Sequence, residues 1–167
     1  MLLIEKITIL ILVTFIPALE LRASIPLGIL SGTVHLPFGL TLQGFGLHWA
    51  SVFFICVLTN IVLGPIVYII IKKFIKHLIK YKAFNNPYQK LVVRTQRKID
   101  KFTRKYGEWA VAAFIAIPLP GSGSYTGALA AYLIGLRFKK FIISNIIGSL
   151  IAGILVTFIS LGIFSLF

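Results

Sequence analysis

The sequence predicts an all-α integral membrane protein made of two inverted repeats, each a re-entrant helical hairpin followed by a transmembrane helix. Three observations lead to this prediction. Of the 167 residues, 58% are hydrophobic, which indicates one membrane domain over 1–167 with no room for a separate soluble domain. Of the 17 Lys and Arg residues, 12 lie in the stretch 72–105, which is typical of a cytoplasmic loop. Two long uncharged stretches each follow a segment that proline and glycine interrupt.

We expect the first re-entrant hairpin over residues 1–32. An apolar run over 7–19 ends at a break that contains Pro17 and Pro26, with Glu20 and Arg22 between them. The charge pattern does not distinguish a re-entrant hairpin from an ordinary transmembrane span over residues 2–20. Only the likeness of the two halves favours the hairpin. The run lacks the cleavage site of a signal peptide. The Gly- and Pro-bearing segment from Ser31 to about Leu47 is expected to be an external loop.

Two stretches are long and apolar enough to be transmembrane helices, 49–71 and 141–167. The first has 23 uncharged residues and ends at Lys72 and Lys73, and the second contains no charged residue. Asn60 and Asn145 lie at equivalent places in the two spans, and we expect them to act as structural hydrogen-bond donors and acceptors between helices.

Between the spans lies a basic linker, 72–106. From Tyr88 to Trp109, apolar residues recur at alternating spacings of four and three, with Lys and Arg between them. This pattern predicts an amphipathic cytoplasmic helix that lies against anionic lipid headgroups, and the same helix could dock a partner protein. The concentration of charge beside the spans argues against nucleic acid as the partner.

The second re-entrant hairpin is expected over 107–136. Its centre, 118–127, contains two prolines and three glycines, which cannot continue one regular helix. Each arm covers roughly half of a ~30 Å bilayer core, and basic residues flank the stretch on both sides. Both ends are therefore placed in the cytoplasm by the positive-inside rule, although a kinked spanning helix is the alternative.

The two halves share short patterns that indicate an internal repeat. An Ile-Pro pair precedes each break, at 16–17 and 117–118, and the spans share Thr-Asn-Ile-Val at 59–62 and Ser-Asn-Ile-Ile at 144–147. Because the first span runs inwards and the second outwards, the repeats are inverted, with the two hairpins entering from opposite sides.

Ionisable residues inside a membrane are costly, so Glu20 and Arg22 are the first candidates for binding a substrate or a proton. The alternative is a mutual ion pair that stabilises the break. Glu108 is a candidate coupling acid, but a glutamate in the first turn of a helix also complements the helix dipole.

The tip of the second break is a candidate site for a polar or anionic group, because a helix start there offers free N–H groups and hydroxyls. The alternative is that the tip only reverses the chain, with glycines forming the turn and Ser and Thr capping the helix. The tip residues are Gly121, Ser122, Gly123, Ser124 and Thr126. Cys56 is the single cysteine, and neither a metal site, a cofactor site nor a catalytic pair is expected.

At its two breaks the sequence resembles the small multidrug export protein family. The similar stretches are 20–27, Glu-Leu-Arg-Ala-Ser-Ile-Pro-Leu, and 118–131, from Pro-Leu-Pro-Gly to Leu-Ala-Ala. That family is distantly similar to the DedA, or SNARE-associated, membrane proteins, some of which carry polyprenyl-phosphate lipids. The resemblance implies functional roles for Glu20, Arg22 and the Pro120-Gly121 tip. The arginines of the DedA pattern beside the second Pro-Gly are absent, which puts tight phosphate binding in doubt.

Together these observations predict a transporter of a bacterial or archaeal cytoplasmic membrane that moves a small solute or lipid headgroup between the hairpin tips, with proton-coupled export through Glu20. A DedA-like polyprenyl-phosphate carrier and a membrane scaffold or assembly factor are the alternatives. A homodimer is left open by the sequence.

Overall fold

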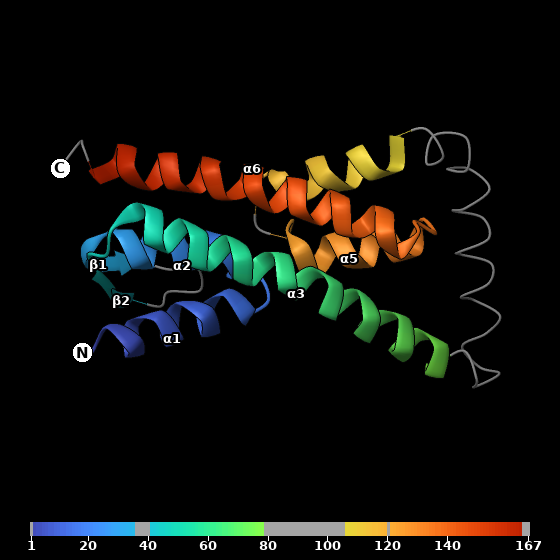
Figure 1. Ribbon diagram of the computed structural model, residues 1–167, viewed down its shortest axis with the longest axis horizontal. Helices are drawn as coiled ribbons and strands as arrows, with labels where there is room; N and C mark the ends of the chain where they lie inside the picture. Colours follow the sequence, from blue (N-terminus) through green and yellow to red (C-terminus); the bar gives the residue numbers. More distant parts are fainter. Residues whose placement is uncertain (1, 36–40, 79–105, 120, 165–167) are drawn as a thin grey trace.

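The computed structural model describes residues 2–35, 41–78, 106–119 and 121–164, which are mostly helical (Figure 1). Most of the predicted basic linker, its amphipathic helix and Pro120 lie outside these ranges. Residues 106–116 are also helical, and Figure 1 does not label this helix. The labelled elements are α1 (Leu3–Phe15), α2 (Glu20–Ile29), β1 (Ser31–His35), β2 (Thr41–Phe45), α3 (Trp49–Leu78), α5 (Ser124–Leu133) and α6 (Phe138–Phe164).

Two of these helices, α3 and α6, are long and apolar enough to cross a membrane, over Trp49–Ile75 and Phe138–Gly162. They lie where the sequence predicts spans. Both helices continue through the basic residues that mark the predicted membrane edge, since α3 runs on past Lys72 to Leu78 and α6 begins before Lys139. Lysine is a good helix former, so the helix does not need to end where the apolar stretch ends.

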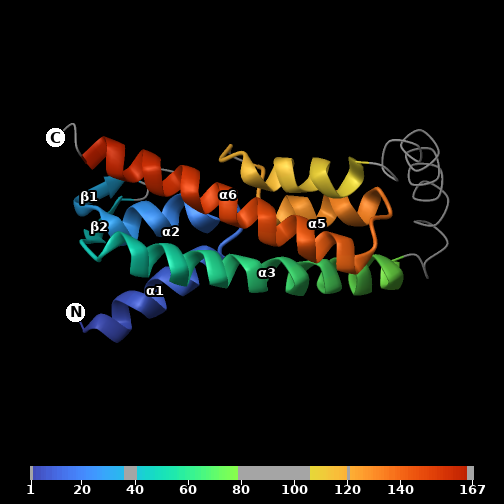
Figure 2. The same cartoon turned by 45° about the horizontal axis from the view of Figure 1, so that its top comes forward.

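Two helix–break–helix segments lie on opposite halves of the molecule (Figures 1 and 2). The first consists of α1, residues 16–19 and α2; the second consists of the helix over 106–116, residues 117–123 and α5. In each, the second helix runs back beside the first, and both breaks lie near the middle of the long axis. The two breaks therefore face each other between the long helices.

Apart from Lys6 and Arg22, the Lys and Arg residues of the described ranges gather at one end of the bundle. Lys72 and Lys73 lie near the C-terminal end of α3, Arg137 ends the turn from α5 to α6, and Lys139 and Lys140 lie in the first turn of α6. The hydroxyl of Tyr68 on α3 donates to the carbonyl of Leu136 in that turn, at 2.9 Å, which fixes the two regions side by side. The N-terminus of α1 and the strands lie at the other end (Figure 1).

The segment after α2 was expected to be a loop, and this expectation was wrong. Residues 31–35 and 41–45 pair as an antiparallel hairpin, in register from Ser31 opposite Phe45 to His35 opposite Thr41. The Lys6 ammonium donates to the carbonyl of Phe45 at 3.0 Å, and Leu47 N–H donates to the carbonyl of Gly28 at 2.8 Å. Glycine and proline indicated a break in the helix, but backbone groups that leave a helix still need partners, and strand pairing supplies them.

Glycines allow the helices of the second half to approach closely. A Cβ atom added at Gly148 on α6 would lie 2.7 Å from Cβ of Ile115 and 2.8 Å from the carbonyl oxygen of Ala112. Both obstacles belong to the helix over 106–116, and one of them is backbone, which cannot rotate away. This contact explains why small residues recur along α6.

We expect Gly148→Ala to lower the free energy of unfolding by about 1–3 kcal/mol, because the added methyl overpacks a helix contact. Gly162→Ala on the same helix is the matched control, since a Cβ there meets nothing within 4 Å. Denaturation by SDS in mixed micelles would measure both. Equal stability of the two variants would contradict the close approach.

Candidate functional site

The first break places Glu20 at the start of α2 by means of an unusual backbone. Ala18 and Glu20 have positive φ angles, 72° and 42°, which are uncommon for residues other than glycine. The chain turns sharply there, so that the Glu20 side chain faces the interior and is only 6% exposed. A buried carboxylate held by a strained backbone is typical of a functional site.

The second break ends at Gly123, which precedes the first residue of α5 with φ 128°. Ser122, one residue earlier, folds its hydroxyl back onto the carbonyls of Ile117 and Leu119, the latter at 2.9 Å. These contacts hold the chain so that the first N–H groups of α5 point toward the first break. Ser124 is fully buried at this helix start.

The Glu20 carboxylate caps α5. Its Oε2 accepts a hydrogen bond from the Ser124 N–H at 2.9 Å, and its Oε1 accepts one from the Tyr125 N–H at 3.3 Å. The first N–H groups of a helix have no partner within the helix, and the helix dipole favours a negative charge at that position. A residue of the first break therefore completes a helix that is more than a hundred positions away in the chain.

Arg22 makes the second connection between the breaks. Its Nη2 donates to the carbonyl oxygen of Ser122 at 2.5 Å and to the Ser122 hydroxyl at 2.6 Å. The hydrogen bonds of Glu20 and Arg22 thus both cross to the second break, and the two side chains hold its tip from either side of Gly123. We call the contact formed by Glu20, Arg22, Ser122, Ser124 and the Tyr125 N–H the tip latch.

Tyr125 adds a connection that the sequence analysis did not predict. Its hydroxyl donates to the carbonyl oxygen of Phe15 at 2.5 Å. Phe15 is the last residue of α1, where a carbonyl has no partner within its own helix. Tyr125 therefore ties the end of α1 to the start of α5, and an aromatic residue directly after a break was the only sequence signal for it.

The two asparagines lie close to the tip latch and link it to the spans. Asn145 on α6 accepts from the Ser124 hydroxyl at 2.8 Å and donates to the carbonyl of Ile61 on α3 at 3.1 Å. Asn60 on α3 donates to the Ser149 hydroxyl on α6 at 3.2 Å. Both asparagines are buried, and their hydrogen bonds join α3, α5 and α6.

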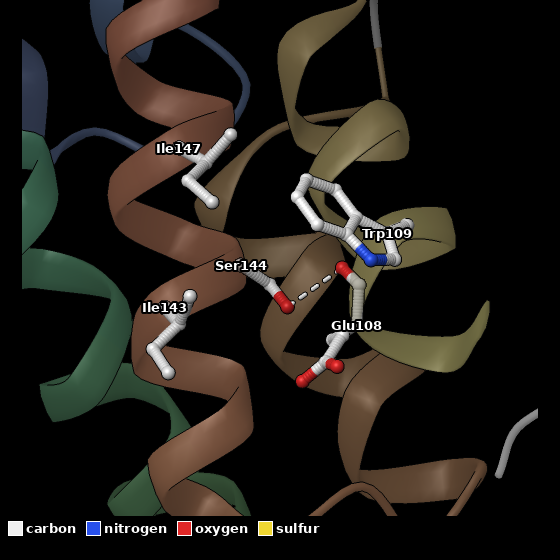
Figure 3. A pocket seen from close by; sticks show the side chains of 5 residues that line it. All are labelled: Glu108, Trp109, Ile143, Ser144 and Ile147. Atoms are coloured by element: carbon white, nitrogen blue, oxygen red, sulfur yellow. Dashed lines mark hydrogen bonds between the residues drawn. The ribbon is translucent and has the colours of Figure 1, made fainter. Parts of the chain in front are cut away.

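Glu108 is not brought to this site. It lies in the helix over 106–116, where its carboxylate pairs with Lys140 at 3.4 Å, and its backbone carbonyl accepts from the Ser144 hydroxyl at 2.7 Å. Figure 3 shows Glu108 and Ser144 at a pocket that Trp109, Ile143 and Ile147 also line. These contacts hold the helix against α6 at the basic end of the bundle, away from both breaks.

Three predicted tip residues remain, Thr126, Gly121 and Pro120. The Thr126 hydroxyl makes a long contact, 3.4 Å, with the carbonyl of Gly123. Gly121 is exposed, and Pro120 lies outside the described residues. Within the described ranges, no group of three His, Cys, Asp or Glu side chains could hold a metal ion.

Beside the tip latch is a cavity of about 10 Å³, as traced by the centre of a water-sized sphere. Residues of α2, α3, α6, the helix over 106–116 and the second break line it, among them Glu20, Arg22 and Asn60. A space of this size holds a single water molecule and excludes any organic solute. The tip latch is therefore closed in this structure.

Comparison with known protein families gives a match over most of the chain. Residues 20–155 match the model of the family described as "Putative small multi-drug export protein". The matched range begins at Glu20 and includes both sides of the tip latch. Searches of curated proteins and of solved structures found no match.

Proposed function

The chain belongs to the family of putative small multi-drug export proteins, and we propose that it moves a small solute across the membrane at the point where its two breaks meet. It is a membrane protein with two long apolar helices. The observation that carries the proposal is the cap that the Glu20 carboxylate forms on the N–H groups of Ser124 and Tyr125. Two charged residues in the middle of an apolar bundle are energetically costly. At a broken helix, such residues are typical of a transport site.

In this proposal the two helix–break–helix segments are re-entrant hairpins of an inverted repeat. Their opposite directions and central breaks support this assignment (Figure 2). The gathering of Lys72, Lys73, Arg137, Lys139 and Lys140 at one end supports a cytoplasmic location for that end, against anionic lipid headgroups. The tip latch then lies near the bilayer midplane, in a cytoplasmic membrane of a bacterium or archaeon.

Transport requires the tip latch to open, because the cavity beside it holds no more than one water molecule. Protonation of Glu20 would open it, since a neutral carboxyl forms a weaker cap than a carboxylate at a helix N-terminus. Opening exposes the N–H groups of α5 and the Glu20 carboxyl, which can bind a cationic solute once it has released its proton. A proton gradient would then drive export by alternately closing and opening the contact.

The direct test uses liposomes that contain the purified protein, a fluorescent organic cation and an imposed pH gradient. We expect wild-type protein to move the cation faster than protein-free liposomes, and the rate to fall when the gradient is abolished. If correctly folded protein moves neither this cation nor the lipid probe described next, the transport proposal is wrong.

A lipid phosphate is the second candidate substrate, favoured by the guanidinium of Arg22 beside the first N–H groups of α5. Once Glu20 has withdrawn, these donors form a site for an anion. Translocation of a short-chain polyprenyl phosphate in the same liposomes, abolished by Arg22→Ala, would assign the protein to this class. Cation movement without lipid movement would assign it to the first.

A further inference from the structure

Three buried side-chain atoms have no hydrogen-bond partner within the part of the chain that the structure describes: Arg22 Nη1, Asn60 Oδ1 and Thr157 Oγ1. The first two belong to side chains that line the cavity beside the tip latch. Arg22 uses its other terminal nitrogen to hold Ser122, and Asn60 uses its amide nitrogen to hold Ser149. Two side chains that line the same small cavity thus each have one atom without a partner, a donor on Arg22 and an acceptor on Asn60.

Leaving both atoms without partners would be costly, because a buried polar group loses its hydrogen bonds to water and regains nothing. Asn60 is only 1% exposed, so bulk solvent does not reach it. A ligand in the cavity that accepts from Arg22 and donates to Asn60 would satisfy both atoms at once.

The charges around the cavity exclude ions. A cation would lie against the guanidinium of Arg22, and an anion would lie against the carboxylate of Glu20, since both residues line the space. The two charges balance, which favours a neutral ligand. The cavity volume of about 10 Å³ limits that ligand to one non-hydrogen atom.

We propose that this cavity binds one ordered water molecule, which accepts a hydrogen bond from Arg22 Nη1 and donates one to Asn60 Oδ1. With Glu20 as a third neighbour, the water has the two to four polar partners that a buried water needs. The water joins α3, through Asn60, to both charged residues of the tip latch.

This water also gives Glu20 a proton donor within a closed site. The carboxylate is 6% exposed, so a proton must reach it through a neighbouring group, and a water molecule can pass one on. This consequence rests on the proposed function, whereas the water site itself does not.

Radiolytic labelling tests the water site without any transport assay. Synchrotron X-rays convert bound water into hydroxyl radicals, which modify the side chains beside it, and mass spectrometry locates the modified residues. Ile115 and Val156 line the cavity but are only 1% and 6% exposed, whereas Ile25 and Leu63, which are 0% and 1% exposed, do not line it. We expect several-fold more labelling of Ile115 and Val156 than of Ile25 and Leu63.

Asn60→Leu should reduce the labelling of Ile115 and Val156 to the level of Ile25, because it removes the acceptor. Ser149→Ala is the matched control, since it removes the other partner of Asn60 and leaves the acceptor at the cavity in place. Equal labelling of all four residues in the wild-type protein, or labelling that persists in a folded Asn60→Leu variant, would overturn the proposal. Either result would leave the transport proposal standing.

Discussion

Replacing Glu20 with alanine is expected to lower the free energy of unfolding by about 2–5 kcal/mol, the largest effect of any substitution at the tip latch. The change leaves two N–H groups of α5 without acceptors, at Ser124 and Tyr125. It also leaves the Arg22 guanidinium half-buried without its neighbouring negative charge. SDS titration in mixed micelles would measure the loss.

Glu20→Gln is the matched control for this prediction. Glutamine keeps an acceptor oxygen of the same reach but carries no charge, so only the charge–dipole part of the contact is lost, about 1 kcal/mol. A Glu20→Ala variant as stable as Glu20→Gln would show that the carboxylate does not cap α5.

The second large effect is expected at Gly123. An added Cβ would lie 2.5 Å from Glu20 Oε2, and the φ of 128° is one that side chains rarely adopt. Gly123→Ala should therefore displace the carboxylate and strain the backbone together, with a cost of about 3 kcal/mol or more.

Gly121→Ala separates these two causes. Its φ of 92° is also positive, but an added Cβ meets nothing within 4 Å, so this variant pays the backbone strain alone. In a double-mutant cycle, Gly123→Ala should cost less in a Glu20→Ala background, because the clash has gone. Additive effects of the two substitutions would contradict direct contact between Gly123 and Glu20.

The sequence predicted the long helices and both breaks because each has a local cause. Hydropathy marks the spans, and proline and glycine mark the breaks, as at Pro17 and Gly123. The helix ends were less predictable, since Lys72 and Lys139 are good helix formers outside the apolar stretches. The hairpin of β1 and β2 was missed because strand pairing depends on a partner strand and not on the glycines that break the helix.

Most residues of the candidate site could be predicted from the sequence, but the hydrogen bonds between them could not. Charge in an apolar segment identified Glu20 and Arg22, and the glycines identified the tip. Their hydrogen bonds to residues about a hundred positions away depend on how the helices pack, which no local pattern encodes. The hydrogen bond from Tyr125 to Phe15 depends on helix packing in the same way. So does the position of Glu108, which pairs with Lys140 away from the site.

The measurement that tests the central claim most directly is the accumulation of a fluorescent organic cation, driven by a pH gradient, in liposomes that contain either wild-type protein or Glu20→Gln. The variant keeps an acceptor oxygen for the N–H groups of α5, but it carries no charge and cannot exchange a proton. We predict that wild-type protein accumulates the cation and that Glu20→Gln, shown to be folded, gives the same signal as protein-free liposomes. Accumulation by Glu20→Gln at the wild-type rate and with the same response to the gradient would contradict the claim that protonation of Glu20 opens the tip latch.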